Sequence, residues 1–296
     1  MTISRGRGTH YHGLRAAMEH TLGVLYRGDW PAKLWALYPR GRRVHCVRER
    51  FSILPPTAAT LRVGFVSDIH IGPTTPPALL DAAFDQLARE RLDVLLLGGD
   101  YVFLAANAAK AARLAELVAR VPATHKLAVL GNHDLWTDHT VLERALDRAG
   151  VHLLENRSYT VAPGVTVVGL DDPWTGSIDA ARAFEGAVDE HASGALIVLC
   201  HSPDGLPAAL AQVTKLAALG AGPSGLYVCG HTHGGQMAAP WGPLWVPGIV
   251  GKRYPYGLHY VPPLYVHVSR GVGATELPIR SYAPADVSVF ELVARR

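Results

Sequence analysis

The sequence has little cysteine and no long apolar run. Its 296 residues include only three cysteines, Cys46, Cys200 and Cys229, each within an apolar stretch typical of a strand. A small and odd number of cysteines excludes a disulfide framework and indicates buried thiols in a reducing compartment. No segment reaches the roughly 18 to 20 uninterrupted apolar residues of a membrane span. The composition is therefore that of an ordinary globular chain, long enough for a large core.

The first residues also lack the features of a secretory signal. Arg15, Glu19 and His20 interrupt the region where its apolar core would lie. Residues 1–50 hold 10 lysines and arginines against 3 acids, a net charge of +7, whereas the other 246 residues hold 18 against 22, a net charge of −4. We therefore expect a cytoplasmic protein, with a peripheral position at the inner membrane face as the alternative.

An amphipathic helix is predicted near the amino terminus. Residues 13–26 place Leu14, Met18, Leu22 and Leu25 near one face at helical spacing, with basic residues nearby. Such a helix either lies on an anionic membrane surface or packs against the rest of the protein, and the sequence leaves both open. We divide the chain into a basic extension over residues 1–55, with this helix and a first strand at 44–54, and a main domain over residues 56–296.

The main domain alternates strands and helices. Apolar runs predict strands at 61–67, 92–97, 126–130, 151–155, 159–161, 165–170, 195–199, 225–229, 264–268 and 287–293. Helical periodicity predicts helices at 76–91, 105–120 and 140–149. This alternation is typical of an α/β fold with right-handed crossovers, in which ligands collect at the carboxyl ends of the strands.

Five of these strands end in short polar motifs. They read SDIH at 67–70, GGD at 98–100, GNHD at 131–134, CHSPD at 200–204 and GHTHGGQ at 230–236. Their side chains of metal-ligating type are Asp68, His70, Asp100, Asn132, His201, His231 and His233. Seven ligands are too many for one ion but suit two ions, about 3.5 to 4 Å apart, that share a bridging carboxylate. Nitrogen and oxygen ligands without thiolate favour Mn, Fe or Zn, and a two-metal site of this kind is typical of phosphoester hydrolysis.

In their order and spacing, these motifs resemble the five blocks of the calcineurin-like metallophosphoesterase superfamily. Tyr101 after GGD, Trp136 after GNHD, GLDD at 169–172 and the trailing GGQ are similar to its YkuE/YaeI-type phosphodiesterase branch. The resemblance covers roughly residues 60–293. It implies a four-layer α/β/β/α sandwich of two mixed β-sheets flanked by helices. It also implies a metal-dependent phosphoric ester hydrolase, with hydroxide bridging two ions as the nucleophile.

The resemblance assigns a role to each motif residue. The cofactors would be two divalent or mixed-valence metal ions, Mn, Fe or Zn. His133 would contact the substrate without binding metal, as a general acid on the leaving oxygen or by stabilising charge on the phosphoryl group. Asp134 would orient the imidazole of His133 by accepting a hydrogen bond from it. The metal ligands divide into Asp68, His70 and His233 for the first ion and Asn132, His201 and His231 for the second, with Asp100 bridging the two.

Several other residues have two interpretations. Asp171 and Asp172 either belong to the site or form an Asx turn before Pro173. Lys252 and Arg253 either contact a second phosphate or are solvated loop charges. A third group of side chains either walls a substrate cleft or packs in the core, and comprises Trp136, Trp174, Trp241, Trp245, Tyr254 and Tyr256. With seven ligands available, His259 and His267 are interpreted as structural.

Two classes of function remain. The first is a phosphodiesterase acting on a phosphate diester, and the basic amphipathic extension favours a phospholipid or a nucleotide-sugar lipid as substrate. The second is a catalytically silent scaffold with the same fold, against which the complete ligand set argues. The chain has no nucleic-acid recognition motif, and the slightly acidic region after residue 50 disfavours nucleic acid as a partner. We expect a monomer.

Overall fold

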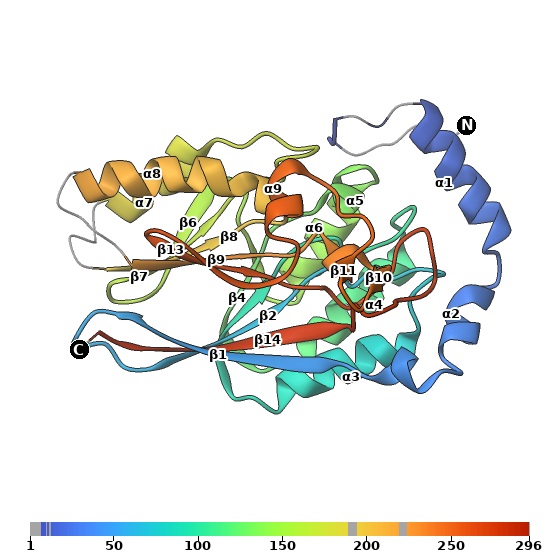
Figure 1. Ribbon diagram of the computed structural model, residues 1–296, viewed down its shortest axis with the longest axis horizontal. Helices are drawn as coiled ribbons and strands as arrows, with labels where there is room; N and C mark the ends of the chain where they lie inside the picture. Colours follow the sequence, from blue (N-terminus) through green and yellow to red (C-terminus); the bar gives the residue numbers. More distant parts are fainter. Residues whose placement is uncertain (1–6, 10, 12, 189–193, 219–223, 296) are drawn as a thin grey trace.

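Two six-stranded β-sheets make up most of the structure, a computed structural model that describes residues 7–9, 11, 13–188, 194–218 and 224–295 (Figure 1). The strands of the first sheet are, in hydrogen-bonded order, β1 (His45–Leu54), β14 (Asp286–Ala294), β2 (Leu61–Val66), β3 (Leu92–Leu97), β4 (Ala123–Ala128) and β5 (His152–Leu153). Those of the second sheet are β12 (Gly257–Val261), β13 (Leu264–Val268), β9 (Ser224–Cys229), β8 (Ala195–Leu199), β7 (Val165–Gly169) and β6 (Arg157–Ala162). Both sheets are mixed, because β14–β2, β6–β7 and β12–β13 are antiparallel and the other pairs are parallel.

The two sheets pack face to face, with helices on both outer faces. Apolar side chains from both sheets, among them Phe65 of β2 and Ile197 of β8, form the central core. Helices α3 (Pro77–Ala88), α4 (Ala108–Ala119) and α6 (His139–Arg148) cover the first sheet. Helices α7 (Ala180–Val188) and α8 (Leu206–Ala218) cover the second. Figure 1 shows the layers from α7 and α8 at the top to α3 at the bottom. The expected four-layer α/β/β/α sandwich is confirmed.

Burial on both faces explains why the central strands are easily recognised from the amino-acid sequence. β3 has the sequence LDVLLL, and all but Asp93 of its side chains are buried, as expected for a parallel strand covered on both sides. Each fully buried leucine contributes roughly 1.5 to 3 kcal/mol to folding. The strands β3, β8 and β13 have the bounds that the sequence predicts. The strand β4 starts at Ala123, three residues before its predicted start, because pairing with β3 also includes the polar segment ATHK.

Some elements were not predicted from the sequence. These are α7, α8 and β12, together with the short helices α2 (Trp30–Trp35), α5 (Asn132–Leu135) and α9 (Ile249–Arg253) and the hairpin β10 (Ala238–Ala239) and β11 (Gly242–Pro243). Most of their sequences are short or rich in alanine and glycine, which leaves few large apolar side chains to mark a pattern. The positions of these elements are therefore set by packing against the two sheets.

The amino-terminal segment joins the sandwich in part. β1 pairs with β14 from His45 to Leu54, so the predicted boundary after residue 55 separates two strands of one sheet. Helices α1 (Gly13–Leu25) and α2 lie outside the sandwich, at the end opposite the carboxyl terminus (Figure 1). No helix within the described ranges is both long and apolar enough to cross a bilayer.

Candidate metal centre

The predicted ligands meet at one place, where strands of both sheets end. Asp68 and His70 follow β2, Asp100 follows β3, and Asn132 follows β4 as the first residue of α5. From the second sheet, His201 follows β8, and His231 and His233 follow β9. All seven side chains are buried. The two sheets therefore each supply part of one cluster, because their parallel strands end at the same edge of the sandwich.

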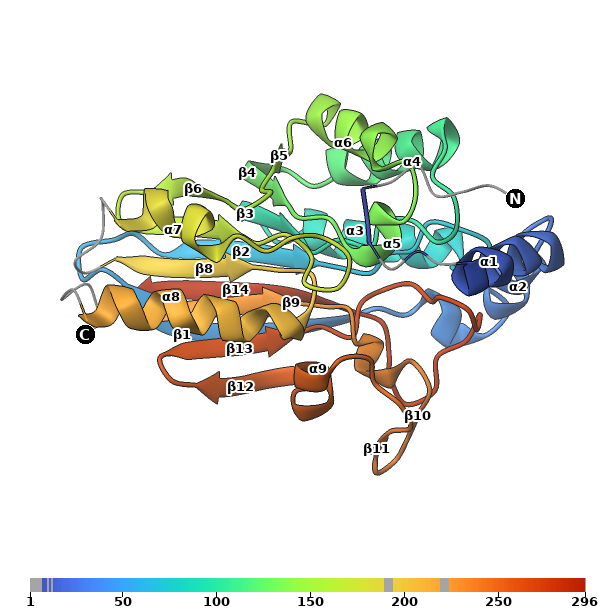
Figure 2. The same ribbon diagram turned by 90° about the horizontal axis from the view of Figure 1, so that it is seen from above.

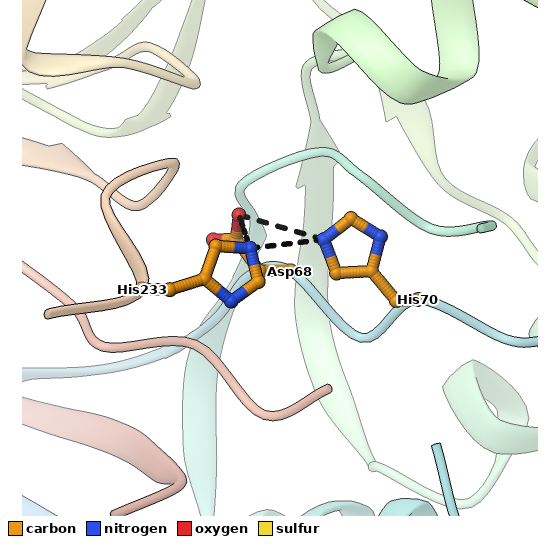
Figure 3. A group of neighbouring side chains, drawn as sticks. All are labelled: Asp68, His70 and His233. Carbon is orange, nitrogen blue, oxygen red and sulfur yellow. Dashed lines mark hydrogen bonds and ion pairs between the residues drawn. The ribbon is translucent and has the colours of Figure 1, made fainter. Parts of the chain in front are cut away.

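The first half of the cluster consists of Asp68, His70 and His233 (Figure 3). Nε2 of His70 lies 3.1 Å from Nε2 of His233, and Nε2 of His233 lies 3.3 Å from Oδ1 of Asp68. The half-buried side chain of Arg280 donates to Nδ1 of His233 at 3.0 Å and to backbone carbonyls, which fixes the orientation of this ring. These three side chains thus present one nitrogen or oxygen each to a common point.

The second half consists of Asn132, His201 and His231. Nε2 of His201 lies 3.2 Å from Oδ1 of Asn132 and 3.2 Å from Nδ1 of His231. The other ring nitrogen of His201 donates to the carbonyl of Gly98 at 2.8 Å, so Nε2 is the ring nitrogen that faces the cluster. The structure therefore brings these three side chains together around Nε2 of His201.

Asp100 lies between the two halves. Its Oδ2 atom is 3.6 Å from Nε2 of His70 and 3.2 Å from Nε2 of His201. Its other oxygen, Oδ1, accepts a hydrogen bond of 2.8 Å from the backbone nitrogen of His133. One carboxylate oxygen therefore faces both groups while the other is held by the backbone, as a bridging ligand requires.

The backbone of the cluster is strained. Asp68, His70, Asp100, His231 and His233 all have positive φ, between 44° and 69°. Residues other than glycine rarely adopt this left-handed conformation, and it persists only where the surroundings enforce it. The two residues after β2 thus enter the site through left-handed backbone, and not through the alternation of a strand. Such strain is concentrated at functional sites.

Two glycines allow the carboxylates to approach the backbone. A Cβ atom at Gly131 would collide with Oδ1 of Asp100, and a Cβ atom at Gly230 would collide with Oδ2 of Asp68. The glycines in the GNHD and GHTH motifs therefore make room for the two carboxylates.

The electrostatics of the cluster favour bound cations. Burial lowers the pKa of His231 and of His233 well below the usual value, so both rings are neutral. Burial opposes ionisation of Asp100 as well, but the neighbouring histidines, His201 foremost, outweigh it and hold the pKa of Asp100 well below its usual range. In return, Asp100 outweighs the effect of burial on His201 and raises the pKa of His201. The buried carboxylate of Asp100 is therefore stabilised by positive charge, which either the protonated ring of His201 or a metal ion can supply.

The residues present fit a binuclear metal site. Asp68, His70 and His233 offer ligand atoms within 4.8 Å of one another, and so does a second group made of Asp100, His201 and His231. Imidazole nitrogens and carboxylate oxygens that face one another this closely repel unless a proton or a cation lies among them. Buried polar groups of this number and kind are typical of a metal centre.

His133 lies at the edge of the cluster. It contributes an edge-on ring contact to His70, at 4.9 Å between centroids, and its Nδ1 atom accepts a hydrogen bond of 3.4 Å from Arg15. Burial lowers the pKa of His133 to about 3, so the ring is neutral and carries its proton on Nε2. Ligand atoms of His70, Asp100 and His133 also lie within 4.8 Å of one another, which leaves a metal-binding role for His133 geometrically open.

The expected hydrogen bond between His133 and Asp134 is not formed. Oδ1 of Asp134 accepts from the backbone nitrogen of Tyr101 at 2.8 Å, and Oδ2 accepts from that of Gly131 at 3.0 Å. This carboxylate is turned away because backbone donors on two strand ends occupy both oxygens. Burial raises the pKa of Asp134 to about 8. Asp134 therefore ties the turn after Asp100 to the GNHD motif and does not orient the imidazole.

A cavity of about 400 Å³ opens over the cluster. Among its lining residues are Asp100, His133 and His231 of the site, and Arg15, which lies on α1 outside all five motifs. The guanidinium of Arg15 donates to Glu276 at 2.9 Å and lies 4.4 Å from the ring centroid of Trp136. Nothing in the sequence pattern reveals this position, because it depends on α1 folding back over strand ends more than 50 residues away.

The cavity distinguishes between the two interpretations of the aromatic and the basic side chains. Trp136, Trp174 and Trp245 line the cavity. Trp241, Tyr254 and Tyr256 are not among its lining residues, and neither are Lys252 and Arg253, which are exposed on α9.

The acidic pair and the remaining histidines have structural contacts. Oδ2 of Asp172 accepts from the backbone nitrogen of Thr175 at 2.7 Å, as in the expected Asx turn. Asp171 forms a bidentate ion pair with Arg7, at 2.7 and 2.9 Å. His267 is buried between the sheets with Ser288 Oγ 2.8 Å away. His259, on β12, contacts the carbonyl of Tyr256 at 3.0 Å. All lie outside the metal cluster.

The chain is similar to known proteins in sequence and in structure. The family model of the calcineurin-like phosphoesterases matches residues 61–235. The phosphodiesterase YaeI of Escherichia coli is 28% identical over 83% of this chain and 87% of its own length. The uncharacterised metallophosphoesterase YkuE of Bacillus subtilis is 32% identical over 56% of each chain. A 5'-nucleotidase precursor from Thermus thermophilus aligns with a TM-score of 0.44 and 19% identity, over 80% of this chain and 55% of that chain.

Proposed function

The chain belongs to the calcineurin-like phosphoesterase family, and we propose that it is a phosphodiesterase that uses two metal ions held by the seven clustered side chains. The observation that carries this proposal is the position of Oδ2 of Asp100 between His70 and His201, at 3.6 and 3.2 Å. Two bound ions would neutralise charge on the phosphoryl group and lower the pKa of an attacking water. The similarity to a phosphodiesterase supports the diester as substrate over the monoester.

His133 is suited to act on the leaving oxygen. Its ring lines the cavity beside Asp100, and the hydrogen bond from Arg15 to Nδ1 leaves the proton on Nε2. A neutral imidazole in this tautomer donates one hydrogen bond and can deliver that proton as negative charge develops on the leaving oxygen. We assign this role to His133, with the ligands Asp68, His70, Asn132, His201, His231 and His233 around it.

Arg15 is suited to bind the phosphate that reacts. Its guanidinium lies within the cavity, 3.4 Å from Nδ1 of His133, and ion pairs with Glu19 at 3.0 Å and Glu276 at 2.9 Å hold it there. A guanidinium offers several N–H donors in one plane, which suits the oxygens of a phosphate. Arg15 therefore contributes a substrate contact from outside the region that the family model matches.

The cavity walls favour a diester with an apolar group. Beside the polar cluster, the wall is made of aromatic and aliphatic side chains, including Trp136, Trp174, Leu244, Trp245 and Leu277. Such a wall binds an acyl chain or a ring, while the metal ligands and Arg15 bind the phosphate. A phospholipid or a nucleotide-sugar lipid has both parts.

Removal and return of metal tests the proposed function. Protein stripped with a chelator should not hydrolyse bis(4-nitrophenyl) phosphate, and Mn, Fe or Zn should restore turnover, because only a bound metal ion lowers the pKa of the attacking water enough for reaction near neutral pH. The measurement is the release of nitrophenolate, with 4-nitrophenyl phosphate as the monoester control. Folded protein that hydrolyses neither ester with any of these ions would favour a catalytically silent scaffold.

Substitution of Arg15 should lower kcat/KM for the diester. We expect Arg15→Gln to lower kcat/KM for the diester by about 10- to 100-fold, because a charge-assisted hydrogen bond contributes roughly 1.5 to 3 kcal/mol. Arg15→Lys, which keeps the charge but not the planar donors, should have an intermediate effect. Arg144→Gln, on the exposed side of α6, is the matched control. If Arg15→Gln and the control have the same kcat/KM, Arg15 does not bind the substrate.

A further inference from the structure

The exposed apolar side chains of this protein are confined to two segments. Among the residues that the structure describes, sixteen large apolar residues are exposed, and all of them lie within residues 14–38 or 241–282. None of the described residues between 39 and 240 belongs to this group. Single exposed apolar residues are normal, but their concentration in two short segments marks an interaction site.

Both segments border the cavity over the metal cluster. Arg15 of α1 lines the cavity on one side, and Leu244, Trp245 and Leu277 line it on the other while 52 to 68% of each of these three side chains remains exposed. Helices α1 and α2 and the β10–β11 hairpin lie toward the same end of the molecule in both views (Figures 1 and 2). We call the exposed side chains of residues 14–43, 241–253 and 277–282 the mouth surface.

The amino-terminal part of the mouth surface is anchored from its inner side. Tyr26 is buried and donates a hydrogen bond of 2.6 Å to the carbonyl of Glu276, which joins the two segments. Trp35 is also buried, and Ala32 donates to the carbonyl of Pro73 at 3.0 Å. With the inner side fixed in this way, Leu14 and Leu37 remain 77% and 76% exposed. Tyr26 and helix α2 therefore anchor this segment, whereas α1 has no buried residue and presents Leu14 outward.

The charges of the mouth surface are predominantly positive. Its exposed cationic side chains are Arg27, Lys33, Arg42, Arg43, Lys252 and Arg253, whereas Asp29 is its one exposed acid among the described residues. Two copies of this surface would repel each other, which disfavours a symmetric dimer. An anionic surface would instead attract it. Apolar side chains interspersed with lysine and arginine, and tryptophans at a loop tip, are the composition of proteins that bind the interface of an anionic bilayer.

We propose that the mouth surface docks on an anionic lipid bilayer and so turns the cavity toward the membrane. Trp241 and Ile249, which are 85% and 87% exposed, enter the interface from one segment, and Leu14 and Leu37 enter it from the other. The cations contact lipid headgroups between them. In this orientation an amphiphilic phosphodiester could reach the metal cluster without leaving the bilayer.

Co-sedimentation of the full chain with lipid vesicles tests the docking. We expect binding to phosphatidylcholine vesicles that contain phosphatidylglycerol, weak binding to pure phosphatidylcholine, and a decrease with salt. The double variants Trp241→Ser/Ile249→Ser and Leu14→Ser/Leu37→Ser should each lower the partition coefficient by at least about 10-fold. Leu258→Ser/Tyr260→Ser is the matched control, because these exposed residues lie on β12, outside the mouth surface.

Three results would contradict the docking surface. They are absence of binding to the anionic vesicles at low salt, equal binding by the control and by both double variants, and a dimer in sedimentation velocity that the double variants dissociate. All substituted residues are exposed, and circular dichroism would verify that each variant folds. Because the assay measures binding and not hydrolysis, its outcome is independent of whether the protein proves to be a phosphodiesterase.

Discussion

Asp100→Asn should abolish metal-dependent hydrolysis while the protein stays folded. Asparagine keeps the shape of the side chain and an oxygen that can accept from the backbone nitrogen of His133, now 2.8 Å from Oδ1. It removes the negative charge that faces His70 and His201. A neutral amide is a poor bridge between two cations, and their joint action on the phosphoryl group is worth several kcal/mol. We therefore expect turnover to fall by about 10³-fold or more.

Metal analysis and a matched variant make this test specific. Elemental analysis of purified Asp100→Asn should show less than the wild-type content of metal, and circular dichroism should show wild-type secondary structure. Asp172→Asn changes another buried aspartate at a strand end, whose Oδ2 accepts from Thr175 at 2.7 Å and which lies outside the ligand clusters, so it should retain metal. Wild-type turnover in Asp100→Asn would refute the two-metal assignment.

His133→Ala should lower turnover by about 10²- to 10⁴-fold, the usual contribution of a general acid, with metal content near wild type. Its ring lies in the cavity, and its backbone nitrogen, which Asp100 needs, survives the substitution. The loss should be greater for diesters with a less acidic leaving phenol, because these depend more on proton delivery. A series of aryl diesters measures this dependence.

The outcome also distinguishes the other roles of His133. An equal loss for all leaving groups would mean that the ring stabilises charge on the phosphoryl group and does not protonate the leaving oxygen. Loss of metal would mean that His133 is a ligand, as its closeness to His70 and Asp100 allows. Trp136→Phe, which alters the neighbouring ring at 5.2 Å but adds and removes no charge, should keep the leaving-group dependence of the wild type.

The sequence predicted the sandwich well because its central strands are buried on both faces. A run such as Leu92–Leu97 favours a covered parallel strand, and the polar residues directly after such a strand lie at the sheet edge. Local patterns also placed α3 and α6 to within a few residues. They were silent on β12 and the β10–β11 hairpin, whose positions depend on the strands they pair with and on contacts from distant residues.

At the site, too, local sequence patterns predicted some features, and contacts between distant segments decided the others. The sequence by itself indicated the seven side chains of the cluster, because each follows an apolar run that is recognisable as a strand. It could not determine that both oxygens of Asp134 face backbone donors, since those donors lie on separate strand ends. It also could not place Arg15 beside His133, across 118 residues of chain. Side chains that follow a strand are fixed by local geometry, whereas contacts between distant segments are decided only when the helices and loops pack around the two sheets.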